Sequence, residues 1–462
     1  NGLLSSINQA LVYLNLLEAG IGTATLQALY RPVAEHNTQD INQILSATNK
    51  YYKKVGTWYF IAVMTLALVF PNIIDSELSS FTIFSVVLLS GMSQVINFFF
   101  QGKYRILMQV EGKNYILTNL GTIINIFTST GKIVLILHGF GIVALQIMYF
   151  AFNIMQMIYI TNYIKNHYKW IDLSVTPNYG AISQKNSVMI HQISGLIFQN
   201  TDVLILTVVC GLKTVSVYSM YVMLFGMVGT AISTINSGVS FAMGQAYNTD
   251  KKKFGVLYNV FETYNMSLTF SLYCIANIFI LPFLQLYTEG VSDISYIDKM
   301  LPYLFITTYL LSNGRSAAQR VIEYAGHFKL TQNRSVIESI INIVVSLVCV
   351  SKFGIYGVLC GTIAALLYRT NDMILYASKR LLKKSPYKTY IKWGVNAALF
   401  VFFVRLFSLI YTKISLNSYF SLILHATVVC LLVIPAFFIA ASVVDRESFK
   451  YCVEFFKNHM KK

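Results

Sequence analysis

The sequence predicts an all-α polytopic membrane protein, and three observations lead to that class. Hydrophobic residues make up 55% of the 462 residues and charged residues only 12%, about half of their usual share in a soluble chain. The mean hydropathy of +0.58 leaves too few polar side chains to cover a water-facing surface. Thirteen segments are long and apolar enough to cross a bilayer, which takes about twenty residues. A series of soluble domains, which the length alone would suggest, is therefore excluded.

We expect the thirteen helices to be joined by short loops. Their approximate ranges are 3–31, 55–74, 79–101, 114–138, 141–163, 187–210, 214–245, 254–285, 299–326, 332–351, 354–378, 391–412 and 417–444. The longest internal loops follow Tyr30 and Tyr163, and no loop is large enough for a catalytic domain. Segments 41–52 and 449–456 are predicted to form short amphipathic helices at the membrane interface.

The distribution of charge predicts the orientation. The chain carries 35 Lys and Arg residues against 19 Asp and Glu residues, a net charge of +16. Most of the cations lie in the loops of one side and in the C-terminal tail. Because cytoplasmic loops retain Lys and Arg, this pattern indicates a multi-pass protein with a cytoplasmic C-terminus, and no nucleic-acid partner. Thirteen crossings place Asn1 outside, and one missing N-terminal helix would give fourteen.

An internal repeat predicts the domain organisation. The first and seventh helices end in similar sequence, Ala28-Leu29-Tyr30 and Ala242-Met243-Gly244, and the outward helices that follow end in Phe70-Pro71 and Leu281-Pro282. A parallel repeat of six helices fits this order. The predicted domains are an N-terminal bundle at 1–163 with five of six helices present, a cytoplasmic linker at 164–186, a six-helix bundle at 187–384, two additional transmembrane helices at 385–445 and a cytoplasmic amphipathic tail at 446–462.

Several charged residues lie inside the expected spans, where each costs at least about 2.5–3.5 kcal/mol unless it is paired or faces a wet cavity. Glu18 and Arg315 lie at the same depth, so we expect them to face one polar cavity. Arg320 and Glu323 share a helix face nearer the cytoplasm, because they are three residues apart. Internal salt bridges that only join helices are the alternative interpretation.

Glu323 and two further groups are predicted to act in gating or coupling. Glu338 and Arg369 lie at matching depths on consecutive antiparallel helices, so we expect an ion pair, with Asp372 as a second acceptor for the guanidinium when Glu338 moves away. Asp202 belongs to the polar run Gln199-Asn200-Thr201-Asp202, which is typical of an interhelical hydrogen-bond cluster or of a cation or proton site. None of the six cysteines has the spacing of a metal site, and we expect no cofactor and no metal.

Several motifs in order along the chain resemble one family. They are Leu17-Glu18-Ala19-Gly20-Ile21-Gly22 with Leu29-Tyr30-Arg31-Pro32, Asp202 with Val215-Ser216-Val217-Tyr218-Ser219-Met220-Tyr221, Gly326-His327-Phe328-Lys329, the stretch 335–342, and Gly361-Thr362 with Arg369 and Asp372. They resemble Gram-positive polysaccharide flippases, the polysaccharide-transporter branch of the multidrug/oligosaccharidyl-lipid/polysaccharide exporter superfamily. The resemblance implies two six-helix bundles plus two C-terminal helices, although the first helix is missing here.

The resemblance also implies a function: transfer of an undecaprenyl-diphosphate-linked oligosaccharide to the outer leaflet of a bacterial plasma membrane, for capsule or exopolysaccharide biosynthesis. Arg315 and Arg320 would bind the diphosphate, because Arg matches phosphate oxygens in a bidentate fork. Glu18 would line the same site, and Na⁺ or H⁺ would be the coupling ion. A multidrug or cation antiporter that couples through Asp202 or Glu18 is the alternative. A polysaccharide polymerase or ligase is disfavoured by the short external loops.

Overall fold

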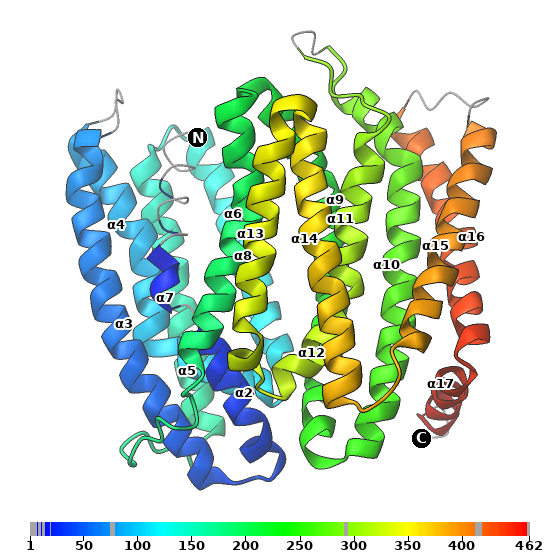
Figure 1. Cartoon of the computed structure of the whole chain (residues 1–462). Helices are drawn as coiled ribbons and strands as arrows, with labels where there is room; N and C mark the ends of the chain where they lie inside the picture. The colour runs from blue at the N-terminus through cyan, green and yellow to red at the C-terminus, as the bar shows by residue number, and fades with distance from the viewer. Residues whose placement is uncertain are drawn as a thin grey trace. The chain divides into compact units, whose positions relative to one another are not determined.

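The computed structural model describes residues 7, 11, 14–18, 20–73, 79–290, 294–411 and 418–459. These residues form helices and connecting turns, with no strand among them (Figure 1). Eleven helices in this part of the chain are long and apolar enough to cross a membrane. Apolar side chains such as Ile123, Ile126 and Phe127 lie exposed on helix faces, as expected where lipid is the solvent. The prediction of an all-α polytopic membrane protein is confirmed.

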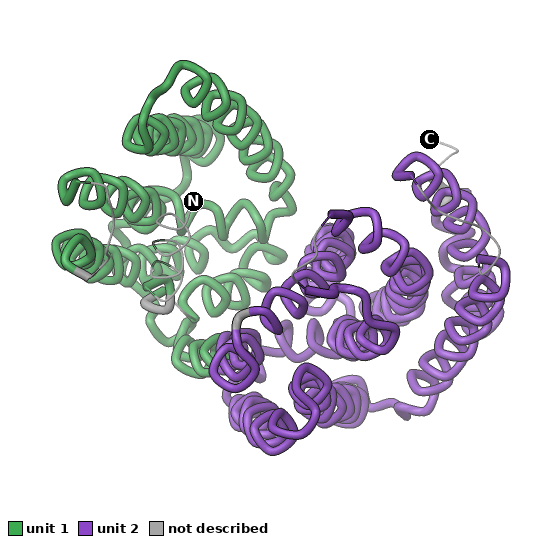
Figure 2. The backbone as a smooth tube through the Cα atoms, turned by 90° about the horizontal axis from the view of Figure 1, so that it is seen from above, with its two compact units in different colours: residues 1–193 green, residues 194–462 purple. Residues whose placement is uncertain are grey.

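The chain divides into two compact units, residues 1–193 and 194–462, coloured separately in Figure 2. The division lies inside α8, and the domain boundaries proposed from the sequence stay a prediction. The elements up to that helix are η1 Asn15–Glu18, α2 Ile21–Ala34, α3 Thr38–Ile73, α4 Ser80–Ile96, η2 Asn97–Gln101, α5 Gly102–Val110, α6 Asn114–Leu137, α7 Ile142–His167 and α8 Lys185–Val209. The later elements are α9 Leu212–Thr249, α10 Lys251–Tyr287, α11 Leu301–Gly314, α12 Ser316–Tyr324, α13 Phe328–Phe353, α14 Ile355–Tyr376, η3 Ala377–Leu381, α15 Tyr387–Tyr411, α16 Tyr419–Val444 and α17 Arg446–His459.

The first unit differs from the prediction at its start. Much of segment 3–31 lies outside the described residues, but Gly20 has a φ of 92° and separates η1 from α2, so the segment is not one helix. A Cβ at Gly20 would lie 2.1 Å from the Lys185 carbonyl oxygen, which shows how closely α8 approaches. The small residues at this point therefore permit close packing of the two segments.

The predicted interfacial helix at 41–52 was wrong as a separate element, because α3 runs without interruption from Thr38 to Ile73. The long loop expected after Tyr30 is likewise a turn of three residues, Glu35 to Asn37. The other predicted helix, at 449–456, is present as part of α17, and its position at the membrane interface stays a prediction. Polar residues distinguish both segments from the apolar spans. In the first segment, however, one helix, α3, continues from a polar first half into an apolar second half.

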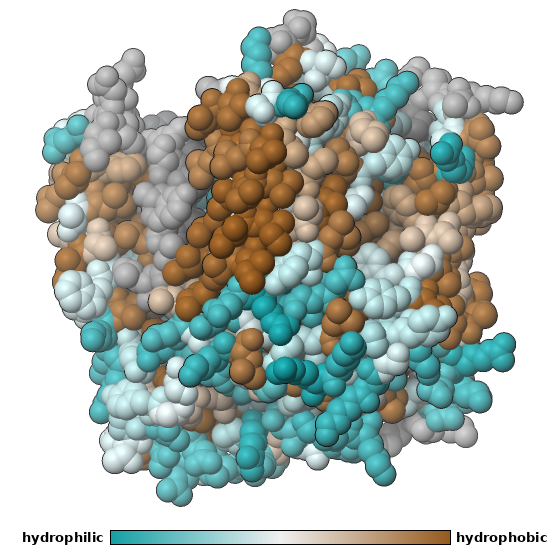
Figure 3. Space-filling model, in the orientation of Figure 1, coloured by the Kyte–Doolittle hydropathy of each residue, from teal (hydrophilic) through white to brown (hydrophobic). Residues whose placement is uncertain are grey.

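In the second unit, α13 and α14 form a closely packed antiparallel hairpin. Figure 3 shows apolar side chains gathered over the upper part of α13, where Ile340, Val344 and Val348 are exposed, and polar side chains toward its lower end. A Cβ at Gly361 of α14 would lie 2.1 Å from Ser346 Oγ and 2.7 Å from the Ser346 backbone nitrogen. The two helix backbones therefore approach at the distance that only a glycine permits.

We expect Gly361→Ala to destabilise the folded chain by about 1–3 kcal/mol, because the added methyl group forces the hairpin apart. The matched control is Gly394→Ala in α15, where an added Cβ meets no atom within 4 Å. That variant should stabilise the chain by up to about 1 kcal/mol, through better helix propensity alone. Unfolding of the purified protein in mild detergent measures both. Equal shifts in the two variants would contradict the packing argument.

Candidate functional site

A helix break in the second unit positions Arg315. The apolar segment 299–326, expected as one helix, consists of α11 and α12 with Arg315 as the junction. A Cβ at Gly314 would lie 2.2 Å from Trp393 Cζ2, so the indole of α15 occupies the space beside the chain at this point. Breaks of this kind inside a span are typical of ion and substrate sites, because they turn backbone and side-chain polar groups inward.

Arg315 is bound to Glu338, which links it to a second arginine. Arg315 Nη1 lies 2.8 Å from Glu338 Oε1, and Glu338 Oε2 lies 3.5 Å from Arg369 Nε. Arg369 is only 1% exposed and is among the largest fully buried side chains described. The ion pair between Glu338 and Arg369 that the sequence predicted is thus present, and Glu338 also holds Arg315.

The cluster continues to the end of α14. Arg369 Nη1 donates to Asp372 Oδ2 at 2.7 Å, Arg369 Nη2 donates to Ser335 Oγ at 3.2 Å, and Arg334 forms an ion pair with Asp372. Arg369 therefore contacts Glu338 and Asp372 together in this structure, whereas the sequence suggested that it would hold them in turn. The two helices α13 and α14 and the junction at Arg315 supply three guanidinium groups and two carboxylates. We call this group the arginine cluster: Arg315, Arg334, Arg369, Glu338 and Asp372.

The other predicted cation, Arg320, lies apart from this cluster in its contacts. Arg320 Nη1 donates to Ser240 Oγ of α9 at 2.7 Å, while Glu323 accepts from Gln319 at 2.8 Å. The described contacts of Arg320 and Glu323 are thus with different partners, and a shared helix face did not make them an ion pair.

Glu18 belongs to the first unit. Its Oε1 accepts from the Tyr52 hydroxyl at 2.8 Å, and its Oε2 accepts from Gln94 Nε2 at 3.4 Å. A Cβ at Gly22 would lie 3.3 Å from the Tyr52 hydroxyl, so the small residues after Glu18 admit this tyrosine. The prediction that Glu18 and Arg315 face one cavity stays a prediction.

Asp202 lies at the centre of a buried hydrogen-bond cluster in the second unit. It accepts from Thr362 Oγ1 at 2.7 Å, Tyr218 at 2.8 Å and Asn342 Nδ2 at 3.3 Å, and its side chain is 3% exposed. All three donors are neutral and come from motifs that carried the family resemblance. The predicted interhelical hydrogen-bond cluster is confirmed. It is joined to the arginine cluster through α13, where Asn342 follows Glu338 by four residues.

A second charged cluster was missed by the sequence analysis. Lys392 of α15 lies 2.9 Å from Glu262 Oε2 in α10 and 3.0 Å from Asp445 Oδ2 at the end of α16. Glu262 also accepts from Tyr258 and Thr389, both at 2.8 Å. The available signal was the Glu262 carboxylate, eight residues into the expected span 254–285. Arg334 was missed as well, although it lies near the start of the expected span 332–351 and precedes Glu338 by four residues on one helix face.

Lys384 lies beside this cluster in the connection between η3 and α15. Its ammonium group donates to Asn259 Oδ1 at 2.8 Å and lies 4.0 Å from the Tyr258 ring centroid. Burial lowers the pKa of Lys384 to about 8, although the Glu262 carboxylate opposes the shift. The folded chain therefore binds fewer protons here than the unfolded chain between pH 8 and the ordinary 10.5, so this group adds stability as pH rises through that window.

We expect the rate at which Lys384 is acetylated to rise with a midpoint near pH 8, because only the neutral amine reacts. Peptide mass spectrometry after brief labelling across a pH series measures it. In Glu262→Gln the midpoint should be lower still, since the neighbouring anion is gone. A midpoint at the ordinary lysine value would contradict the assignment.

Comparisons with known proteins relate this fold to one class of transporter. No protein-family model matches the sequence. No curated protein matches it. The solved structures that match include the Vibrio cholerae MATE transporter VcmN, at 12% identity with a TM-score of 0.64, over 83% of this chain and 90% of that one. The MATE transporter ClbM in complex with Rb⁺ has 14% identity and a TM-score of 0.64, over 85% and 88%.

A third structure comes from the same superfamily. It is a MOP superfamily transporter from Pyrococcus furiosus whose reversed binding-pocket polarity suggests a different function, with 14% identity and a TM-score of 0.59 over 83% of this chain and 88% of that one. The described chain is thus a polytopic membrane protein with the fold of MATE transporters of the MOP superfamily. At these identities the likeness concerns the fold.

Proposed function

We propose that this protein is a flippase that moves an undecaprenyl-diphosphate-linked oligosaccharide from the cytoplasmic to the outer leaflet of a bacterial plasma membrane by alternating access, with its C-terminus in the cytoplasm. The observation that carries the proposal is the arginine cluster at the break between α11 and α12. Three guanidinium groups against two carboxylates leave an excess positive charge inside the membrane-spanning part of the second unit, which favours an anionic group over a cationic drug.

Arg315 is the residue of this cluster best suited to bind a phosphate. Its Nε is buried without a hydrogen-bond partner among the described residues, so one donor of the fork is unused. An entering diphosphate would satisfy that donor and compete with Glu338 for the guanidinium. Arg369 would stay paired with Asp372 and add its charge. Arg320 would bind the outgoing part of the head group, with Glu18 and Glu323 as polar contacts along the path.

Asp202 is our candidate for the coupling site. A buried carboxylate that meets only neutral donors among the described residues is suited to exchange a proton or Na⁺, because no fixed cation competes for it. Binding there would alter the hydrogen bonds of Asn342 and Thr362. Both residues belong to the α13–α14 hairpin that also carries Glu338 and Arg369, so the two clusters have a direct structural link.

Asp202 also supports a second candidate function, a multidrug or cation antiporter. In that case a cationic substrate would use the same carboxylate, and the arginine cluster would serve only to join helices. The two functions differ in their demand on Arg315. A flippase needs the guanidinium for the diphosphate, whereas a cation antiporter does not.

The deciding experiment reconstitutes the full chain in proteoliposomes with a fluorescent polyprenyl-diphosphate oligosaccharide and, separately, a cationic dye. Arg315→Ala should abolish oligosaccharide transfer at normal protein abundance, and Arg315→Lys should restore part of it because it keeps the charge without the fork. The matched control is Arg405→Ala, which removes an exposed arginine from α15. Normal transfer by Arg315→Ala excludes the proposed head-group contact, and dye transport without oligosaccharide transfer supports the antiporter instead.

A further inference from the structure

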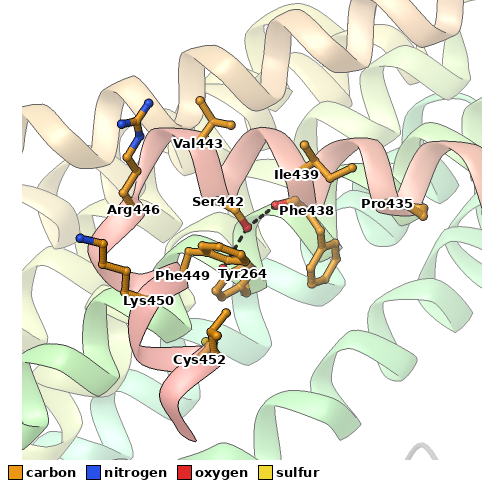
Figure 4. A pocket seen from close by; sticks show the side chains of 11 residues that line it. Tyr264, Pro435, Phe438, Ile439, Ser442, Val443, Arg446, Phe449, Lys450 and Cys452 are labelled. Atoms are coloured by element: carbon orange, nitrogen blue, oxygen red, sulfur yellow. Dashed lines mark hydrogen bonds between the residues drawn. The ribbon is translucent and has the colours of Figure 1, made fainter. Parts of the chain in front are cut away.

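A cavity of about 780 Å³ lies between α10, α16 and α17 at the end of the last membrane-spanning helix. Figure 4 shows Tyr264, Phe438 and Phe449 along it, with Arg446 and Lys450 at the junction of α16 and α17. Its walls are almost entirely apolar except at that junction. The cavity belongs to neither the arginine cluster nor the Asp202 cluster.

We propose that this cavity is a binding site for one anionic glycerophospholipid, with an acyl chain against α16 and the phosphate at Arg446 and Lys450. The proposal does not depend on the transported substrate. It rests on the shape of the site and on the charge complementarity at its mouth.

The depth of the cavity matches a lipid. Lining residues on α16 extend from Pro435 to Val443, which corresponds to roughly 12 Å of helix rise. The inner end therefore lies at the level of hydrocarbon, inside the span that ends at Val444. The mouth lies where the chain leaves the span and turns into α17. An occupant must be apolar at one end and polar at the other, which describes a membrane lipid.

The charges at the mouth select an anionic head group. Arg446 and Lys450 are four residues apart, so they share a face of α17, and both are exposed. The neighbouring Asp445 does not cancel them, because its carboxylate is held by Lys392 at 3.0 Å and by Thr263 at 2.9 Å. The Lys392 charge and these hydrogen bonds outweigh burial and hold the pKa of Asp445 below its usual range. The other acids of α17, Glu447 and Glu454, are both exposed to solvent.

The wall of the cavity is fixed by its own contacts. The Tyr264 and Phe438 rings stack with centroids 5.6 Å apart. The Ser442 hydroxyl donates to the Phe438 carbonyl at 2.8 Å, so the Tyr264 hydroxyl, 3.0 Å away, donates to Ser442. Both polar side chains in the wall are thereby satisfied without an occupant, and they leave an apolar surface for an acyl chain.

The test is lipid binding to the purified full chain by native mass spectrometry, with phosphatidylglycerol and phosphatidylcholine of the same acyl chains as probes. We expect one phosphatidylglycerol to be retained in preference to phosphatidylcholine. In the double variant Arg446→Gln, Lys450→Gln the affinity for phosphatidylglycerol should fall about thirtyfold, since each basic contact near the surface contributes about fivefold. Affinity for phosphatidylcholine should not change.

Two control experiments distinguish binding at this site from general effects of charge and of side-chain size. Lys388→Gln with Lys457→Gln removes two exposed cations from the same unit outside the cavity and should leave the preference intact. Val443→Trp should fill the cavity and weaken both lipids, whereas Leu431→Trp, at a side chain 71% exposed on α16, should not. An unchanged phosphatidylglycerol affinity in the Arg446, Lys450 double variant overturns the proposal, and so does an equal loss in the Lys388, Lys457 control. Inorganic phosphate that displaces the lipid would show a free-anion site instead.

Discussion

Lys392→Met should destabilise the second unit by about 3–5 kcal/mol, the usual cost of leaving a buried charge unpaired. Lys392 is 5% exposed and is the cation that lies between Glu262 and Asp445. Without it, two carboxylates face each other at the meeting of α10, α15 and the end of α16. Resistance to unfolding in mixed detergent micelles, followed by circular dichroism, measures the loss.

The double variant Glu262→Gln, Lys392→Met provides the internal control, because it removes the charge pair together. It should be more stable than Lys392→Met alone, since neutral Gln still accepts from Tyr258 and Thr389. Lys388→Met removes an exposed lysine one helical turn earlier and should change stability by less than about 0.5 kcal/mol. If Lys388→Met and Lys392→Met behave alike, the ion pairs of Lys392 do not stabilise the fold.

The second large effect is expected at Glu338, which is shared by two arginines. Glu338→Gln leaves Arg315 and Arg369 facing each other, so we expect a loss of about 3–5 kcal/mol and a loss of transport. Arg369→Gln should cost a similar amount, because Arg369 is the buried link between Glu338 and Asp372. The double variant should cost less than the two single variants together, and a double-mutant cycle on abundance and transport measures the coupling.

The outcomes of this cycle distinguish a static structural role of the Glu338–Arg369 pair from a role in gating. Strictly additive losses would show that the two residues do not interact. A stable Glu338→Gln, Arg369→Gln protein with full transport would be compatible with the pairing in the native chain but would contradict a role in gating. Because Arg369 holds both carboxylates at once here, gating requires that Glu338 be released while Asp372 stays bound.

Much of the fold could be predicted because a bilayer imposes a simple length rule. Eleven of the thirteen expected spans appear as long apolar helices in the described chain. The rule fails where packing decides the backbone. The break at Arg315 depends on Trp393, which is distant in sequence and meets Gly314. The separation of α2 from η1 depends on contacts between Gly20 and α8. Neither contact produces a periodic pattern in the sequence from which it could be predicted.

The candidate site was predictable where two residues lie on consecutive helices. The number of residues between each side chain and the short turn that joins the two helices was enough to pair Glu338 with Arg369. The same count could not find the contact between Glu338 and Arg315, because it depends on where α11 ends. Lys392, Glu262 and Asp445 come from three helices separated by long stretches of sequence, so only tertiary packing brings them together. A charged residue inside an expected membrane span can be recognised from the sequence, but its ion-pair partners cannot be predicted from it.

The break at Arg315 also bears on how the chain enters the membrane during synthesis. Neither α11, with 14 residues, nor α12, with 9, is long enough to cross hydrocarbon alone. The acid that neutralises Arg315 lies 23 residues further along, in α13. While that acid is still inside the ribosome, the segment has an unpaired cation near its middle, and we expect it to wait at the translocon or the lipid interface. We then expect α11, α12 and α13 to insert into the membrane together. A ribosome stalled before Glu338 would leave α11 and α12 uninserted.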